Sequence, residues 1–141
     1  MILLDTNVVS EVMKPEPEPT VLAWLDSVPA TSLSISSVTQ AEILYGIALL
    51  PQGKRRLALA DAAWTVFRVY FPGRIFPFDS EAAVAFADLA VGRRRSGHSV
   101  SQPDAQIAAI ALSRNASLAT RNTRDFVNCG VELIDPWTHH A

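Results

Sequence analysis

The sequence has a single cysteine, no long apolar run and no excess of basic residues. Cys129 alone excludes a disulfide within the 141-residue chain and is typical of a reducing, cytoplasmic environment. No apolar run approaches the roughly 18 residues that a membrane span requires, so we expect no membrane partner. The net charge of −2 provides no general attraction to nucleic acid, which bound cations or local basic patches would have to supply. The one compact basic run, residues 92–97, either binds phosphate or forms a solvated helix end, and both interpretations remain open.

The sequence also lacks the short motifs of several enzyme classes. It contains no Gly-Lys-Ser/Thr phosphate loop, no Gly-x-Gly-x-x-Gly dinucleotide motif and no Gly-x-Ser-x-Gly nucleophile elbow. Its histidines, which are His98, His139 and His140, have no cysteine partners at the spacing of a zinc site. We therefore expect none of the activities that depend on these motifs.

What the sequence does contain is a regular alternation of short apolar runs and longer amphipathic segments. Hydrophobic residues make up 49% of the chain and charged residues 18%, which suits one packed α/β domain over residues 1–141. The pattern predicts strands near residues 1–4, 32–36, 74–78, 117–119 and 131–134. It predicts helices over residues 6–13, 20–28, 38–50, 54–70, 80–95 and 104–114, the third capped by Ser37, and a short last helix that ends near residue 130.

Strands separated by helices indicate a central parallel sheet covered on both faces, a three-layer α/β/α arrangement. In such sheets the functional site lies at the carboxyl ends of the strands. Asp5, Thr6 and Asn7 directly follow the first predicted strand, so these side chains can hold a metal ion or its waters. An equally open interpretation is that Asp5 only caps the following helix.

Two further carboxylates lie in predicted helices. Glu42 follows the start of the third helix and borders its core-facing stripe, where an unpaired charge is costly. Asp104 follows Pro103 in the first turn of another helix, where acidic residues also occur because they offset the partial positive charge of the helix terminus. For both carboxylates, a purely structural role is the alternative to metal binding.

Polar residues also follow the fourth predicted strand. Thr120, Asn122 and Asp125 can supply a fourth group that faces a metal ion. Asp125 can instead pair with Arg121 or Arg124. The same two arginines are the better candidates for contacting the phosphate backbone of a nucleic acid.

Several oxygen ligands in one place suit Mg²⁺ or Mn²⁺. Both ions prefer oxygen, and Mg²⁺ keeps several waters, so about two to four carboxylates suffice to hold it. Such ions activate a water and stabilise charge on the attacking and leaving oxygens of a phosphodiester. Without metal the carboxylates repel one another, and we expect their pKa values to be raised.

Four stretches of the sequence resemble the motifs of one protein family. Residues 2–11 (ILLDTNVVSE), 36–46 (SSVTQAEILYG), 103–111 (PDAQIAAIA) and 119–126 (ATRNTRDF) follow the order of the motifs of PIN-domain ribonucleases. The chain resembles in particular the VapC and FitB-like toxins of bacterial type II toxin–antitoxin modules. Each motif is weak alone, but the four in register span nearly the whole chain.

The resemblance implies a PIN-like fold and a Mg²⁺- or Mn²⁺-dependent endoribonuclease that hydrolyses RNA. Asp5, Glu42 and Asp104 match the core acidic positions of the family. Asn122 stands where many relatives carry Asp, and Thr120, Thr6 or Asp125 can complete the shell around the metal. This departure leaves the number of metal ions open.

The resemblance also implies partners. Toxins of this kind usually form homodimers and are held inactive by a cognate antitoxin, which carries the contact with DNA. Val8, Val9, Trp24 and Leu25 can form the antitoxin groove, although core packing is the alternative for most of them. Two other functions remain: a catalytically weak scaffold of an antitoxin–DNA repressor complex, favoured by the missing fourth Asp, and a nuclease of structured DNA.

Overall fold

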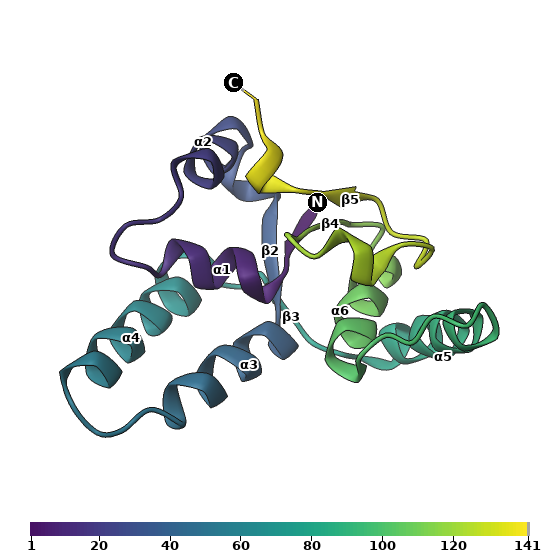
Figure 1. Cartoon of the computed structure of the whole chain (residues 1–141), viewed down its shortest axis with the longest axis horizontal. Coiled ribbons are helices and arrows are strands. Elements are labelled where there is room, and N and C mark those ends of the chain that lie inside the picture. Colours follow the sequence, from purple (N-terminus) through teal and green to yellow (C-terminus); the bar gives the residue numbers. More distant parts are fainter. Residues whose placement is uncertain (141) are drawn as a thin grey trace.

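A parallel β-sheet lies at the centre of the computed structural model, which describes residues 1–140 (Figure 1). Its strands are β1 (Ile2–Leu4), β2 (Leu33–Ser36), β3 (Ile75–Phe76), β4 (Ser117–Ala119) and β5 (Leu133–Ile134). They are arranged in the order β3-β2-β1-β4-β5, and every pairing is parallel. The predicted parallel sheet is confirmed, although β3 and β5 are shorter than predicted.

Helices connect the strands and cover the sheet (Figure 1). They are α1 (Thr6–Val12), α2 (Pro19–Ser27), α3 (Ser37–Ala48), α4 (Lys54–Thr65), α5 (Ser80–Arg95) and α6 (Gln102–Ser113). The chain also forms 3₁₀ turns at Ala30–Ser32, Thr123–Phe126 and Pro136–Thr138, and a π-helical turn at Val66–Tyr70. Among the helices of residues 1–140, none has both the length and the apolar character needed to cross a membrane.

Two apolar clusters pack against the two faces of the sheet. Successive residues of a strand point to opposite faces, and in β1 Leu4 joins one cluster while Leu3 joins the other. The cluster around Leu4 includes Val9 of α1 and Ile43 of α3, and the cluster around Leu3 is built mainly from α5 and α6. The predicted three-layer α/β/α architecture is therefore confirmed.

The ends of two helices differ from the sequence prediction. Ser36, not Ser37, caps α3, because its backbone is extended (φ −101°, ψ 158°) and its Oγ accepts a hydrogen bond from the Thr39 N–H at 3.0 Å. The helix predicted over residues 54–70 changes at Val66 into a π-helical turn, in which the Phe71 N–H donates to the Val66 carbonyl at 3.1 Å.

The C-terminal part of the chain also departs from the prediction. The short last helix is a 3₁₀ turn at Thr123–Phe126, whose Phe126 side chain is buried in the core. A further 3₁₀ turn, Pro136–Thr138, was not predicted. Asp135 caps this turn by accepting a hydrogen bond from the Trp137 N–H at 2.9 Å.

The order of the strands reverses between β1 and β4. β1 connects to β2 on one side of it, whereas β4 and β5 lie on the other side. A crevice opens outside the carboxyl ends of the strands at such a switch point, because the connecting helices diverge there. The Asp5 N–H donates to the Ala119 carbonyl at 2.9 Å and so extends the ladder to the last residue of β4. The residues that follow these two strands therefore lie next to each other.

Candidate functional site

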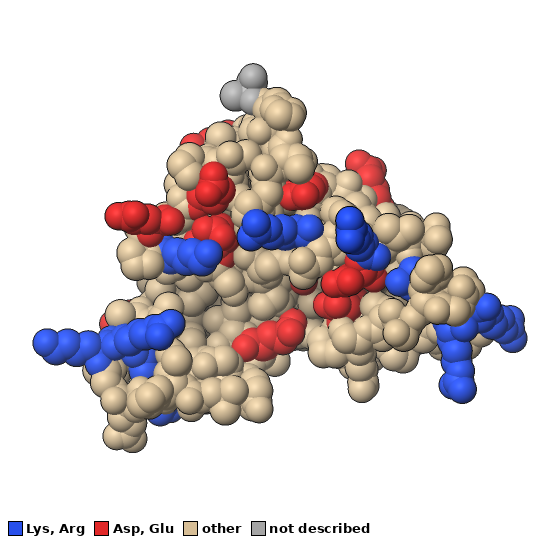
Figure 2. Space-filling model, in the orientation of Figure 1, with Lys and Arg blue, Asp and Glu red and all other residues tan. Residues whose placement is uncertain are grey.

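A polar cavity of about 420 Å³ lies at this switch point. Seven of the residues proposed from the sequence line it: Asp5, Thr6, Asn7, Glu42, Asp104, Arg121 and Asn122. Of the remaining three, Thr120 is fully buried behind Asp5, and Arg124 and Asp125 line a neighbouring hollow of about 240 Å³ that shares Arg121 and Asn122 with the cavity. In Figure 2 the hollowed face of the molecule carries acidic side chains near its centre, basic side chains just above them and further basic side chains on both flanks.

Asp5 is held rigidly at the end of β1. Its Oδ1 accepts a hydrogen bond from the Thr6 N–H at 2.8 Å, so the capping role that the sequence left open is present. Its Oδ2 accepts a hydrogen bond from Thr120 Oγ1 at 2.7 Å. A carboxylate has about four lone-pair positions on its two oxygens, so capping does not exhaust its capacity to bind a further ligand.

The pKa of Asp5 is raised from its ordinary value of 3.8 to about 6. Burial is the largest cause, because the side chain is removed from water, and the hydrogen bonds from Thr120 and Thr6 oppose it. The negative charges of Asp104 and Glu42 raise the pKa further. Repulsion between carboxylates thus acts in the expected direction, but burial is the stronger effect.

Glu42 reaches the cavity from α3. Contrary to the expectation that it borders the core, Glu42 is exposed, while the next residue, Ile43, packs into the core. Thr6 Oγ1 donates to Glu42 Oε1 at 2.7 Å and also lies 3.0 Å from Thr39 Oγ1. Each hydroxyl carries one proton, so while Thr6 donates to Glu42, Thr39 donates to Thr6. This chain of hydroxyls fixes the Glu42 carboxylate beside the end of β1.

Asp104 reaches the cavity from the first turn of α6. Its backbone N–H donates to Ser101 Oγ at 3.3 Å, so Ser101 is the cap of the helix. Burial raises the pKa of Asp104, and the charges of Asp125 and Glu42 raise it further. The pKa of Asp104 is therefore affected by charges on two other elements, α3 beside the cavity and the 3₁₀ turn Thr123–Phe126 beside the neighbouring hollow.

Asn7 joins the segment after β1 to the segment after β4. Its Nδ2 donates to Thr120 Oγ1 at 3.3 Å, and its Oδ1 accepts a hydrogen bond from the Arg121 N–H at 3.3 Å. Thr120 Oγ1 also accepts from the Asn122 N–H at 3.1 Å. The side chain of Asn122 makes no capping bond to the 3₁₀ turn that it precedes. The backbone on both sides of Asn122 is thus fixed while its side chain lines the cavity.

Asp125 does not form the ion pair that the sequence allowed. Within residues 1–140 the ion pairs are Lys14 with Glu11 and Arg114 with Asp79. Asp125 pairs with neither of the two arginines beside it.

Several residues of the cavity wall were not proposed from the sequence, namely Ser10, Glu11, Lys14 and Trp137. Glu11 is buried; its Oε1 lies 3.0 Å from Lys14 Nζ, and its Oε2 accepts a hydrogen bond from the Glu18 N–H at 3.0 Å. Trp137 packs under the guanidinium of Arg121, 5.1 Å from the ring centre. An acidic residue among the apolar positions of the first helix was the one available signal for Glu11.

The donor chemistry of the cavity suits a hydrated hard cation. Carboxylate oxygens of Asp5, Glu42 and Asp104 border it, and their mutual repulsion favours a cation between them. Within residues 1–140, however, no three Asp, Glu, His or Cys side chains converge tightly enough to hold an ion directly. Mg²⁺ usually keeps several waters, and an open set of carboxylates fits that habit better than a closed cage would.

The basic run of residues 92–97 is divided by burial. Arg93 is buried and donates hydrogen bonds to the carbonyls of Val127 and Asp125, whereas Arg94 and Arg95 are exposed at the end of α5. Arg93 therefore supports the loop after Asn122. Cys129 is buried, and burial raises the pKa of its thiol, which agrees with a packing role.

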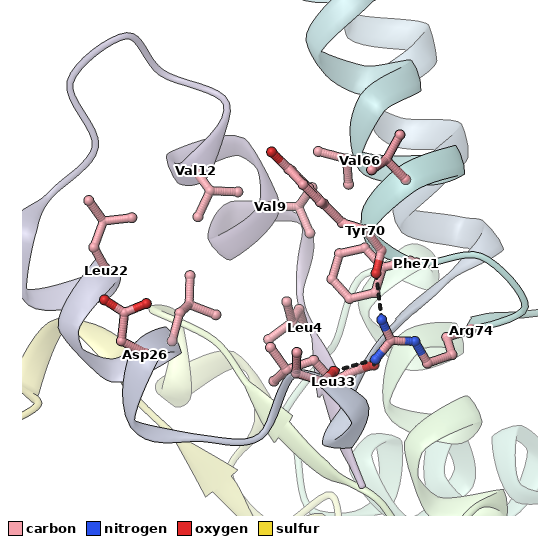
Figure 3. Close-up of a pocket in the computed structure, with 13 residues that line it drawn as sticks. Leu4, Val9, Val12, Leu22, Asp26, Leu33, Val66, Tyr70, Phe71 and Arg74 are labelled. Atoms are coloured by element: carbon pink, nitrogen blue, oxygen red, sulfur yellow. Dashed lines mark hydrogen bonds between the residues drawn. The ribbon is translucent and has the colours of Figure 1, made fainter.

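An apolar groove of about 700 Å³ lies apart from the polar cavity, between α1, α2 and the π-helical turn (Figure 3). Leu22 and Asp26 lie on one side of it, Tyr70 and Phe71 on the other, and Val9 between them (Figure 3). Two of the four residues considered for a partner groove, Val9 and Leu25, line it. The other two, Val8 and Trp24, do not line it, and both are buried in the core, as Val9 also is.

Comparisons with known proteins identify relatives of the chain. A family model described as PIN domain matches residues 2–130. The chain is 39% identical to the VapC ribonuclease Y4jK of Sinorhizobium fredii, over 97% of this chain and 98% of the relative. It is 38% identical to the toxin FitB of Neisseria gonorrhoeae, over 97% and 99%. The solved structure of FitAB bound to an IR36 DNA fragment superposes with a TM-score of 0.91 at 37% identity, covering 100% of this chain and 99% of that one.

Proposed function

Because the chain belongs to the PIN-domain family, we propose that it is the toxin of a type II toxin–antitoxin module and cleaves RNA with a divalent metal ion. The observation that carries this proposal is the cavity at the switch point, which Asp5, Glu42 and Asp104 border from three separate elements. Relatives named as a VapC ribonuclease and as the toxin FitB support the activity and the biological role.

Asp5, Glu42 and Asp104 would hold Mg²⁺ or Mn²⁺, with Asn122 completing the set as a neutral ligand or by holding a water. When bound, such an ion lowers the pKa of a coordinated water and stabilises charge on the scissile phosphate. The protein's own contribution is to fix the carboxylates: Thr120 orients Asp5 by donating to Oδ2.

The substrate also needs contacts outside the metal site. Arg121 lies on the wall of the cavity, and Arg124 lines the hollow beside it. Both are exposed, and neither is held in an ion pair within residues 1–140. We assign to them the contacts with the RNA backbone, since guanidinium groups bind phosphate well without reading sequence.

The apolar groove is proposed to bind the cognate antitoxin. Structures of the relative FitB have been solved in complexes with its partner, one of them bound to DNA. They support an antitoxin that makes the contact with DNA, so that the toxin itself need not. Leu22, Val69 and Tyr70 line the groove and remain exposed, so an apolar stretch of the partner would remove them from water. The groove is separate from the polar cavity, and a longer antitoxin segment would have to cover both.

We also propose that the chain acts as a single domain and forms a homodimer. Large apolar side chains stay exposed on α3, at its C-terminal cap and on α5, namely Tyr45, Leu49 and Val84, each about two-thirds exposed. Exposed apolar residues of this size support a surface for self-association. Light scattering at two protein concentrations measures the mass, and a monomer at both would contradict this part of the proposal.

The nuclease proposal is tested by induced expression and by cleavage of purified RNA. We expect growth arrest by the wild type and none by Asp5→Asn or Asp104→Asn. Cleavage of RNA should require Mg²⁺ or Mn²⁺, stop with a chelator, and be absent in both variants. Asp88→Asn, a change at an exposed position of α5, is the matched control and should behave as the wild type.

Two results would redirect the proposal. A folded wild type that cuts no RNA would favour the alternative of a scaffold in an antitoxin–DNA complex, which the neutral Asn122 supports. Parallel assays on structured DNA test the remaining alternative, because a preference for DNA would contradict RNA as the substrate. Cleavage that persists with both carboxylates replaced would refute the assignment of the site.

A further inference from the structure

A pocket of about 300 Å³ adjoins the polar cavity, between α1, α3 and α4. It shares Thr6, Ser10 and Glu42 with the cavity, so the two form one continuous depression. The rest of its wall is mostly apolar, with Met13, Ile43, Gly46, Ile47, Leu50 and Leu59, and the wall also includes Arg55. We call this pocket of about 300 Å³ the side pocket.

Gly46 leaves the side pocket open. It lies inside α3, where a glycine makes the helix less stable than an alanine would. A Cβ added at Gly46 would meet no atom within 4 Å, so packing does not require the glycine. Its φ is not in the left-handed region either, so the backbone does not require it. The glycine does keep the wall of the pocket free of a side chain.

The charges around the side pocket match a segment of nucleic acid. At one end it opens into the carboxylate cavity, where a metal ion would hold the scissile phosphate. Arg55 lies on its wall, next to Lys54 and Arg56 in the first turn of α4, and makes no ion pair within residues 1–140. An apolar wall between these two ends offers a surface on which the flat face of an unstacked base can lie.

We propose that the side pocket binds a nucleobase of single-stranded RNA adjacent to the scissile phosphate, with Arg55 contacting a neighbouring phosphate. The proposal rests on the proposed nuclease function and deepens it, because it assigns where the RNA gains affinity beyond the metal site. Thr6 and Glu42 at the mouth offer polar groups to the edge of the base. The pocket thereby becomes a determinant of which RNA is cut.

The test fills the pocket without disturbing the helix. Gly46→Leu introduces a strong helix former whose side chain occupies the open space, so thermal stability should be kept or increased. Gly92→Leu is the matched control, because Gly92 also lies inside a helix, also has no atom within 4 Å of an added Cβ, and does not line the pocket. The substrates are an RNA oligonucleotide and a set of versions that each lack one base beside the cleavage site.

We expect Gly46→Leu to lower kcat/KM on the intact RNA by about tenfold or more, because the base loses its burial against the apolar wall. Its activity should equal that of the wild type on the one abasic substrate whose missing base would fill the pocket. Gly92→Leu should match the wild type on every substrate. Arg55→Gln should raise KM, with kcat little changed, and should weaken the dependence of KM on salt.

Unchanged cleavage of intact RNA by Gly46→Leu would overturn the proposal, and so would an equal loss on intact and abasic RNA. A variant that cuts normally but no longer binds antitoxin would assign the pocket to that protein instead. Direct binding of the same oligonucleotides separates this failure from failure of the nuclease function. If the wild type cuts nothing but binds intact RNA more tightly than abasic RNA, and Gly46→Leu abolishes the difference, the pocket stands and the activity does not.

Discussion

Replacing Asp5 with Asn is predicted to stabilise the metal-free protein at neutral pH. Asp5 is only 4% exposed, and its pKa is raised to about 6 from an ordinary value of 3.8. At about 1.4 kcal/mol for each pH unit, this difference corresponds to about 3 kcal/mol of folding free energy. An asparagine has nearly the same shape and can still accept a hydrogen bond from the Thr6 N–H, but it carries no charge.

The direction of the pH dependence follows from the raised pKa. The folded protein binds the proton of Asp5 more tightly than the unfolded chain does, so protonation favours folding. This contribution is complete below about pH 3.8 and is lost as the pH rises through about 6. At pH 7.5 with a chelator present, the ionised carboxylate therefore lowers the stability of the wild type. The free energy of unfolding of Asp5→Asn should be higher than that of the wild type by up to about 3 kcal/mol.

Urea unfolding in EDTA at pH 4 and pH 7.5 measures the effect. The advantage of Asp5→Asn over the wild type should grow with pH, whereas Asp88→Asn should change little at either pH. Adding Mg²⁺ or Mn²⁺ at pH 7.5 should stabilise the wild type and not Asp5→Asn, since only the wild type keeps the full set of carboxylates. If Asp5→Asn is no more stable than the wild type at pH 7.5, the burial argument is refuted.

Two other changes test neighbouring parts of the structure. Thr120→Val removes the hydroxyl that donates to Asp5, so we expect the free energy of unfolding in urea to fall by about 1–3 kcal/mol. Because this hydrogen bond lowers the pKa of Asp5, the pH profile of RNA cleavage should shift to higher pH. An unchanged profile would count against the contact. Leu22→Asp places a charge in the apolar groove, where it would be costly to bury. Calorimetry with the purified antitoxin should show an affinity at least about tenfold weaker than that of the wild type, while RNA cleavage is retained. Normal affinity would exclude the groove as the docking surface.

Local patterns predicted the elements of the fold but not their order. The alternation of short apolar runs and amphipathic segments placed all five strands near their observed positions, because burial on both faces of a parallel sheet leaves a clear apolar signature. The position of β1 between β2 and β4 depends on pairing across more than 110 residues, as in the register of Leu4 with Ala119. Such pairing leaves no mark in a local window.

The same limit applies to the side chains around the cavity. The sequence pattern could not decide whether Glu42 is exposed or buried. Successive side chains of a helix point in directions about 100° apart, so Glu42 can be exposed while the adjacent Ile43 lies in the core. Arg93 belonged to a basic run that is typical of a solvated helix end. Arg93 can be buried because its guanidinium donates hydrogen bonds to the carbonyls of Asp125 and Val127, which are distant in the sequence.

The strand order also explains why Asp5 combines burial with free binding capacity. At the switch point one carboxylate oxygen is held by the helix that begins after β1, and the other by Thr120 after β4. These contacts come from two directions of the fold, so they fix the carboxylate without surrounding it, and the remaining lone pairs can meet a ligand in the cavity. The burial that raises the pKa of Asp5 is thus a consequence of the same placement that fixes its geometry. A fold that buried Asp5 less would stabilise its charge better and position the carboxylate less well.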